Sequence, residues 1–143
     1  MSQPLTVYIA SSFRNVHAVK MLTDRLRAIG CIVLDWTSKA PPLPADMPIE
    51  ERKLKLDADE YGDIFAFCVN ACACADLVIY IGPAGQDAAC EVGIAWTVGV
   101  PVYGLRGKLE APGLVLSKAV TRWFDDVGDL LRSLYADQPG GRP

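Results

Sequence analysis

The sequence predicts a single α/β domain in which helices cover a parallel sheet of about five strands. Three observations support this prediction. Short apolar runs alternate with amphipathic helical stretches along the chain, which is typical of an α/β fold. The runs lack the polar alternation of half-exposed strands, as expected for strands buried on both faces. At 143 residues, with 51% hydrophobic and 22% charged residues, the chain has the size and composition of one globular domain.

The first unit of the chain is a strand, a helix and a second strand. Residues 5–10 are short and apolar, and they end at Ser11, a residue type that caps helices. Apolar side chains then recur every three or four positions over 16–29, and Gly30 supplies a helix end. Residues 31–35 begin the next strand at once. Units of this kind close right-handed into parallel sheets.

The middle of the chain begins with a proline-rich segment. Four prolines and no periodicity over 37–49 predict a long loop, and loops of this length in compact domains are often functional. A mixed stretch follows over 50–75, in which we expect a helix from about Asp59 onward. Beyond it we expect a strand, a turn and a helix, over 77–81, 82–85 and 87–99.

The last third supplies the remaining strands. We expect a strand over 100–105, a loop over 106–113, a short fifth strand over 120–124 and an amphipathic helix over 127–135. The resulting order is that of a Rossmann-like or flavodoxin-like three-layer sandwich.

This architecture indicates where a ligand would bind. We assign residues 1–138 to the domain and 139–143 to a frayed tail. In such folds ligands bind beyond the carboxyl ends of the strands, where the strand order reverses. The loops to examine are therefore 11–15, 36–48 and 82–91.

Composition and missing motifs exclude several classes of function. A net charge of −3 and a pI near 5.1 disfavour nucleic-acid binding and polybasic membrane attachment. No apolar run approaches the roughly 18–20 residues of a membrane helix. Residues 1–4 show no basic or apolar signal-peptide pattern, so we expect a cytoplasmic protein without a disulfide framework.

Metal and dinucleotide sites are also not expected. The chain lacks a glycine-rich dinucleotide loop and a Walker A motif, and it has one histidine. Cys68 and Cys72 would share a helix face while Cys74 points elsewhere, which favours buried thiols over a metal site. We therefore expect neither a metal nor a cofactor.

Two strand ends carry candidate functional residues. Ser11, Ser12, Arg14 and Asn15 follow the first strand at an expected helix N-terminus, which suits an anion; simple helix capping with a surface arginine is the alternative. Glu91 lies among small apolar residues early in the helix after the third strand. A buried carboxylate there suits nucleophilic or acid–base chemistry on a sugar, whereas a solvated glutamate would only complement the helix dipole.

Four sequence blocks together resemble the nucleoside 2-deoxyribosyltransferase family, which includes the related deoxynucleotide N-hydrolases. The blocks are VYIASSFR at 7–14, ADLVI at 75–79, PAGQDAACEVGIA at 83–95 and GVPV at 99–102. They occur in the family's order, and the resemblance spans roughly 5–135. The block that ends in Glu-x-Gly-x-Ala, followed by Gly-x-Pro, is the most specific part.

The resemblance implies cleavage of the N-glycosidic bond of a deoxynucleoside or its 5′-monophosphate. A glutamate attacks the anomeric carbon, and water or an acceptor base resolves the glycosyl-enzyme. Glu91 matches the nucleophile, and Tyr8 matches the tyrosine that orients it. Phe13 matches an aromatic residue that lies beside the base. The loop that holds the 5′-phosphate is matched by Ser11, Ser12 and Arg14. Gly85 would lie against the sugar or phosphate. Dimers or larger homo-oligomers are also implied, with Trp96, Trp123 and Phe124 as interface candidates or as core residues.

Some positions depart from the family pattern. Cys68 stands where the family carries an aspartate that contacts the leaving base, and Asn70 nearby can bond a base but cannot protonate it. Gly85 replaces a further carboxylate, for which Asp87 is a candidate substitute. These departures leave two alternatives open: a non-catalytic nucleotide-binding or sensing domain, and a different N-glycoside such as a nicotinamide nucleotide.

Overall fold

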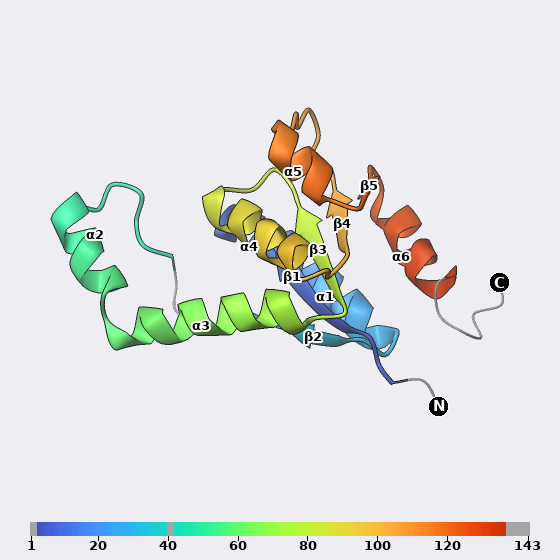
Figure 1. Cartoon of the computed structure of the whole chain (residues 1–143), viewed down its shortest axis with the longest axis horizontal. Coiled ribbons are helices and arrows are strands. Elements are labelled where there is room, and N and C mark those ends of the chain that lie inside the picture. Colours follow the sequence, from blue (N-terminus) through green and yellow to red (C-terminus); the bar gives the residue numbers. More distant parts are fainter. Residues whose placement is uncertain (1–2, 40–41, 137–143) are drawn as a thin grey trace.

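The computed structural model describes residues 3–39 and 42–136, and its centre is a sheet of five parallel strands (Figure 1). The strand order is β2-β1-β3-β4-β5. The strands are β1 (Thr6–Ala10), β2 (Ile32–Leu34), β3 (Leu77–Ile81), β4 (Val102–Leu105) and β5 (Arg122–Phe124). The predicted parallel sheet and single α/β domain are confirmed.

The helices lie on both sides of this sheet. They are the 3₁₀ turn η1 (Phe13–Asn15), α1 (Val16–Ala28), α2 (Ile49–Leu56), α3 (Asp59–Cys74), α4 (Gln86–Thr97), α5 (Leu114–Ala119) and α6 (Val127–Ala136). The β1–β2 crossover runs in the opposite direction to the later ones. Right-handed connections therefore place α1 on the face opposite α3 and α4. None of the described helices is long and apolar enough to cross a membrane.

The core is densest around the two central strands. Val7, Ile9, Val78 and Ile79 are at most 1% exposed, because helices cover both faces of the sheet there. Each such side chain contributes about 1.5–3 kcal/mol through the surface that it removes from water. The core therefore holds β1 and β3 rigidly, and the loops that follow them are anchored at one edge of the sheet.

Two short helices differ from the sequence-based expectation. Helix α2 lies before the helix expected from Asp59, in a stretch for which the sequence predicted no element. Its apolar side chains Ile49, Leu54 and Leu56 are exposed, so the sequence lacks the buried apolar stripe that would predict a helix there. Its acidic first turn and basic last turn complement the helix dipole instead. Helix α5 fills the interval between the expected loop and fifth strand, and it is too short to show a period.

The remaining differences are small. Strands β2 and β5 are shorter than expected, because a strand at the edge of a sheet has one neighbour and ends where the pairing ends. Phe124, an interface candidate, is 6% exposed and belongs to the core, whereas Trp96 is exposed. The expected tail at 139–143 and part of the proline-rich loop lie outside the described residues.

Candidate active site

A tyrosine and a glutamate form the centre of the candidate site. Tyr8 lies in β1, and Glu91 lies in the second turn of α4. The Tyr8 hydroxyl donates a hydrogen bond to Oε2 of Glu91, although 83 residues separate the two. Because α4 packs against both β1 and β3, it holds the Glu91 carboxylate over the point where the strand order reverses. The fold thus brings together the two residues that the resemblance implied.

Burial decides the electrostatics of this pair. Removal from water raises the pKa of Glu91 from 4.5 to about 7, the Tyr8 hydroxyl opposes this shift, and the charge of Asp87 adds to it. Burial, followed by the Glu91 charge, raises the pKa of Tyr8 well above its usual range. Tyr8 therefore remains a hydrogen-bond donor, while Glu91 changes charge near neutral pH. A carboxylate with this perturbed pKa at a sheet edge is typical of a functional group.

The cysteine that replaces the family's aspartate lies beside this pair. The Cys68 thiol on α3 interacts with the Tyr8 hydroxyl, and burial raises its pKa. Cys68 is therefore an uncharged neighbour of Glu91. All five cysteines lie in the described part of the chain and are free thiols. Within residues 3–39 and 42–136, no group of three His, Cys, Asp or Glu side chains is placed to hold a metal ion.

The loop after β1 is tied to the loop after β3. Ser11 Oγ donates to the carbonyl of Ile81 at 2.9 Å, and Asn15 Nδ2 donates to the carbonyl of Pro83 at 2.7 Å. Asn15 also donates to Ser11 Oγ at 3.1 Å. Ser11 is buried, and its hydroxyl proton is used in the bond to Ile81, so its side chain joins the two loops.

Ser12 and Arg14 remain available on the outside of this loop. Arg14 is exposed, and its Nε donates to Ser12 Oγ at 3.2 Å. A guanidinium and a hydroxyl side by side, next to the first turn of α1, suit an anionic group. The role of these two residues in binding an anion stays a prediction.

Aromatic side chains build one wall next to this loop. The Phe13 ring packs edge-on against Trp36, with 4.9 Å between ring centroids. Trp36 Nε1 in turn donates to the carbonyl of Ile9 at 2.6 Å. Trp36 was not singled out from the sequence, although a tryptophan directly after a strand at the carboxyl edge is the kind of signal that would indicate it.

The other predicted residues are placed differently. Gly85 caps the N-terminus of α4, and Asp87 lies in its first turn, close enough to influence the Glu91 pKa. Asn70 is exposed on α3. Two residues along a helix correspond to a rotation of roughly 200°, so Asn70 points away from the side that Cys68 presents to Tyr8.

A second tyrosine–glutamate pair lies on the next strand. Tyr80 donates to Glu110 Oε2 at 2.6 Å, and the Gly107 amide donates to Oε1 at 2.9 Å. A Cβ at Gly82 would collide with this carboxylate, so the close approach requires glycine there. No short-range motif links residues 30 positions apart, which is why the sequence did not indicate this pair.

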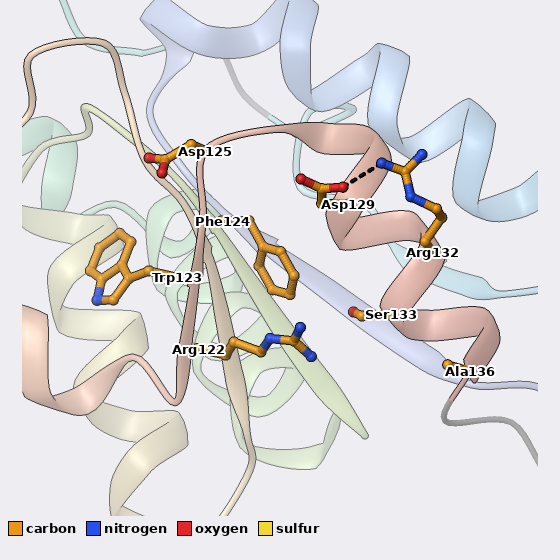
Figure 2. Close-up of a pocket in the computed structure, with 8 residues that line it drawn as sticks. All are labelled: Arg122, Trp123, Phe124, Asp125, Asp129, Arg132, Ser133 and Ala136. Carbon is orange, nitrogen blue, oxygen red and sulfur yellow. Dashed lines mark hydrogen bonds and ion pairs between the residues drawn. The ribbon is translucent and has the colours of Figure 1, made fainter.

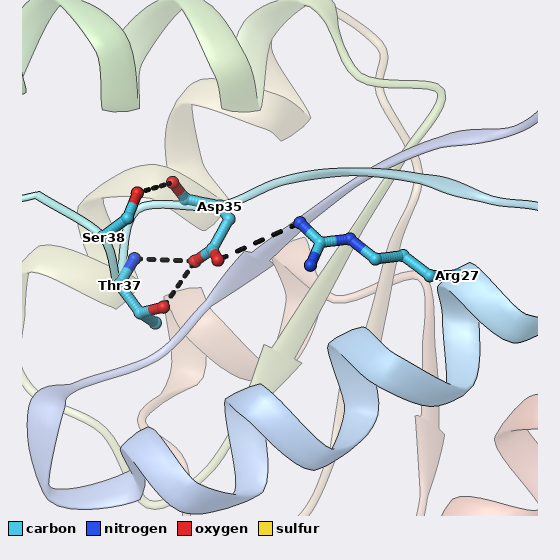
Figure 3. Close-up of polar contacts among 4 residues, drawn as sticks. All are labelled: Arg27, Asp35, Thr37 and Ser38. Atoms are coloured by element: carbon cyan, nitrogen blue, oxygen red, sulfur yellow. Dashed lines mark hydrogen bonds and ion pairs between the residues drawn. The ribbon is translucent and has the colours of Figure 1, made fainter.

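The turn after β2 is held by Asp35. Its Oδ1 accepts from the Thr37 amide at 2.8 Å and from Thr37 Oγ1 at 2.6 Å, and Arg27 approaches Oδ2 at 4.0 Å (Figure 3). Ser38 Oγ donates to the Asp35 carbonyl at 3.4 Å. These contacts fix the turn that carries Lys39.

Two cavities flank these elements. One, of about 530 Å³, lies between that turn and α3 and is lined by Ser38, Lys39, Glu60, Asp63, Ile64 and Phe67. The other, of about 520 Å³, lies between β5 and α6 and is lined by Arg122, Trp123, Phe124, Asp125, Asp129, Arg132, Ser133 and Ala136 (Figure 2). Arg132 is paired with Asp129 in the second cavity, and neither cavity is lined by a site residue predicted from the sequence.

Fold and site together define an α/β domain with a tyrosine–glutamate pair at its switch point, in which Tyr8 is buried and Glu91 is partly buried. No family model matches the chain, and a comparison with curated proteins found no match. Solved structures do match. A 2-deoxyribosyltransferase from the psychrotolerant bacterium Bacillus psychrosaccharolyticus shares 21% identity with a TM-score of 0.62, over 87% of this chain and 89% of that chain.

Two further structures have the same fold. The Clostridium botulinum CMP N-glycosidase BcmB shares 15% identity with a TM-score of 0.55, over 93% of this chain and 99% of that chain. A conserved protein from Enterococcus faecalis V583 shares 16% identity with a TM-score of 0.63, over 94% and 99%. The resemblance to the nucleoside 2-deoxyribosyltransferase family is thus confirmed at the level of the fold.

Proposed function

We propose that this protein cleaves the N-glycosidic bond of a nucleoside or nucleoside 5′-monophosphate through a covalent glycosyl-Glu91 intermediate. The hydrogen bond between Tyr8 and Glu91 is the observation that carries the proposal. This bond holds Oε2 of a partly buried carboxylate at the switch point, and Tyr8 leaves the other carboxylate oxygen unbonded. The shared fold of a 2-deoxyribosyltransferase and a CMP N-glycosidase supports the same reaction type.

The mechanism follows from this geometry. Tyr8 holds Oε2 of Glu91, so Oε1 attacks the anomeric carbon of the sugar. The bond to the base nitrogen breaks, and its electron pair leaves with the base. Water or an acceptor base then attacks the same carbon and releases the carboxylate. A site with little water strengthens the attraction between the carboxylate and the positive charge that develops on the sugar.

The other site residues bind the substrate in this proposal. Arg14 and Ser12 hold a 5′-phosphate, and Phe13 lies beside the base. Gly85 lets the chain approach the sugar closely, and Asp87 lies near the nucleophile. Ser11 contributes by holding the loop.

A second candidate function is a nucleotide-binding or sensing domain without catalysis. It is favoured by Cys68, an uncharged thiol where the family carries an acid, and by the outward placement of Asn70. The intact Tyr8–Glu91 pair favours the enzyme. The partner is in both cases a small nucleoside or nucleotide. We further propose a cytoplasmic homo-oligomer.

Chromatography of a mixed panel of nucleosides and 5′-monophosphates tests the proposal. Wild type and Glu91→Ala are compared with and without an added free base. If wild type releases the substrate's base when no acceptor base is added, and Glu91→Ala does not, the protein is a hydrolase. If a new nucleoside forms only when the acceptor base is present, the protein is a transferase. If nothing turns over but nucleotides raise the melting temperature, the binding domain is correct. Base release that persists in Glu91→Ala contradicts the covalent mechanism.

A further inference from the structure

We propose that the cavity between the Ser38–Lys39 turn and α3 holds the base, and that the Lys39 ammonium protonates the base as it departs. This inference rests on the proposed function and names the group that replaces the missing carboxylic acid. It is drawn from three observations: a cavity of suitable size, a lysine held in its wall, and the proximity of that wall to the Tyr8–Glu91 pair.

The reaction needs a proton donor or cation at the base. Heterolysis of the C–N bond leaves an electron pair on the base nitrogen, and the base leaves poorly unless that charge is neutralised. Cys68 is a half-buried thiol whose pKa is raised by desolvation, and Asn70 lies on another side of α3 and cannot act as an acid. Tyr8 is bonded to Glu91. Lys39 is the one cation among the residues that line this cavity.

Two sets of contacts define the position of Lys39: one to its ammonium and one within the turn that carries it. Its Nζ lies 4.4 Å from the centroid of the Phe67 ring, a cation–π contact that holds the ammonium against the cavity wall. On the other side the Asp35 hydrogen bonds fix the turn that carries it (Figure 3). Lys39 is exposed, and its ammonium contacts α3 through the Phe67 ring.

The cavity is linked to the nucleophile through α3, by way of Cys68 and Tyr8. Ile64 lines it, and Cys68 follows one helical turn later on the same side of α3, a rise of about 5.4–6 Å. Cys68 interacts with Tyr8, which holds Glu91. Burial raises the pKa of the Cys68 thiol whereas Lys39 lowers it, so the ammonium lies within electrostatic reach of Cys68. A sugar at Glu91 would thus place its base toward this cavity.

The volume and the lining fit a base. About 530 Å³ falls within the 300–1,000 Å³ range of small-molecule sites. Phe67 offers an aromatic wall, and the carboxylates of Glu60 and Asp63 can accept from an exocyclic amino group. We therefore expect a base with an amino group as well as a ring acceptor for Lys39.

The step balances without any further reactant. Oε1 of Glu91 forms a bond to the anomeric carbon, and the C–N electron pair moves to the base. The Lys39 ammonium gives one proton to the base, which leaves neutral, and the resulting amine takes a proton back from water. The Glu91 ester is then resolved by water or by an acceptor base.

Kinetics with leaving groups of different quality test the role of Lys39. Lys39→Met should lower kcat/KM for an ordinary base about 100-fold, the usual contribution of a general acid. For an analogue with an electron-withdrawing ring fluorine, whose base leaves without help, the loss should be much smaller. Lys39→Arg should keep a positive charge beside the base but should donate a proton poorly. Lys20→Met, which removes an exposed lysine of α1, is the matched control. Equal losses for both substrates would overturn the proton-donor role.

A binding measurement separates this inference from the proposed function. Calorimetry with the free base should show binding to wild type and to Lys20→Met, with at least tenfold weaker binding to Lys39→Met. If wild type releases no base yet shows this pattern, the proposed function and the proton-donor role fail, and the assignment of the cavity is supported. Base binding that does not depend on Lys39, or no base binding at all, overturns the assignment.

Discussion

At the scale of single residues, Glu91 is the position where folding and function conflict. Burial beside Tyr8 raises its pKa to about 7, so its carboxylate is harder to ionise in the folded chain than in the unfolded one. A group held at this cost in free energy is not explained by packing alone. Two consequences can be measured separately, one in stability and one in the pH dependence of the rate.

Glu91→Gln should stabilise the protein at alkaline pH. Below pH 4.5 the Glu91 carboxyl is protonated in both the folded and unfolded states, whereas above about pH 7 it is ionised in both and the folded state bears the penalty. The stability from this group is therefore lost as pH rises from 4.5 to 7. Glutamine keeps an acceptor for Tyr8 and has no charge. We expect a gain of about 3 kcal/mol at pH 8 that vanishes below pH 4.5, measured by urea unfolding. A difference that does not vary with pH would contradict this.

Tyr8→Phe should move the pH profile of base release upward. The nucleophile must be ionised, so kcat/KM should rise with pH around the Glu91 pKa of about 7. The Tyr8 hydrogen bond lowers that pKa, and its removal should shift the inflection to higher pH as well as slowing the reaction. Tyr80→Phe is the matched control, because its hydroxyl bonds Glu110 instead. An unchanged inflection in Tyr8→Phe would show that the tyrosine does not act through Glu91.

At the scale of elements, the site depends on loops that the strands hold but do not themselves shape. Asn15 spans the loop after β1 and the turn after β3, with one bond to the Pro83 carbonyl and one to Ser11. These bonds keep the first turn of α4 in register with the Arg14 loop. Ser11 adds its own bond to the end of β3.

Asn15→Ala should weaken both stability and substrate binding. Loss of the bonds to Pro83 and Ser11 should cost about 1–2 kcal/mol of unfolding free energy. Because the two loops are then free to separate, KM should rise severalfold while kcat changes less. Ser133→Ala is the control: it removes a bond within α6 and should leave KM unchanged. If KM is the same in both variants, the link between the loops has no role in binding.

The sequence indicates elements best where burial leaves a pattern. The four blocks that carry the family resemblance correctly place β1, β3 and the start of α4, because buried strands and capped helices have local signals. Helix α2 was missed because its apolar side chains are exposed. Tyr80–Glu110 and the Lys39–Phe67 contact were missed because they join segments far apart in sequence, and no spacing predicts them.

At the scale of the whole molecule, two neighbouring helices, α4 and α5, carry exposed apolar side chains. Trp96 on α4 is 64% exposed, and Leu114 and Val115 on α5 are 76% and 79% exposed. Helices α4 and α5 contact one another, so these side chains belong to neighbouring elements. Apolar residues on adjoining helices are typical of a surface that another molecule covers. This is the surface on which the expected homo-oligomer would form.

Trp96→Glu should therefore dissociate the oligomer. We expect wild type to elute as a dimer or larger in size-exclusion chromatography with light scattering, and Trp96→Glu to elute as a folded monomer. Tyr135→Glu, on α6 and 49% exposed, should behave like wild type. A monomeric wild type at micromolar concentration would contradict the assembly.

Trapping the covalent intermediate tests the central claim most directly. Fluorine at C2′ destabilises the positive charge that develops on the sugar in both steps, and a base that leaves easily restores the first step. A 2′-fluoronucleoside with such a base therefore accumulates as the glycosyl-enzyme. Peptide mass spectrometry of the treated wild type should find the fluorinated sugar on the peptide that contains Glu91, and Glu91→Gln should carry none. Wild type that releases base from ordinary nucleosides, yet carries the sugar elsewhere or nowhere, would contradict nucleophilic attack by Glu91.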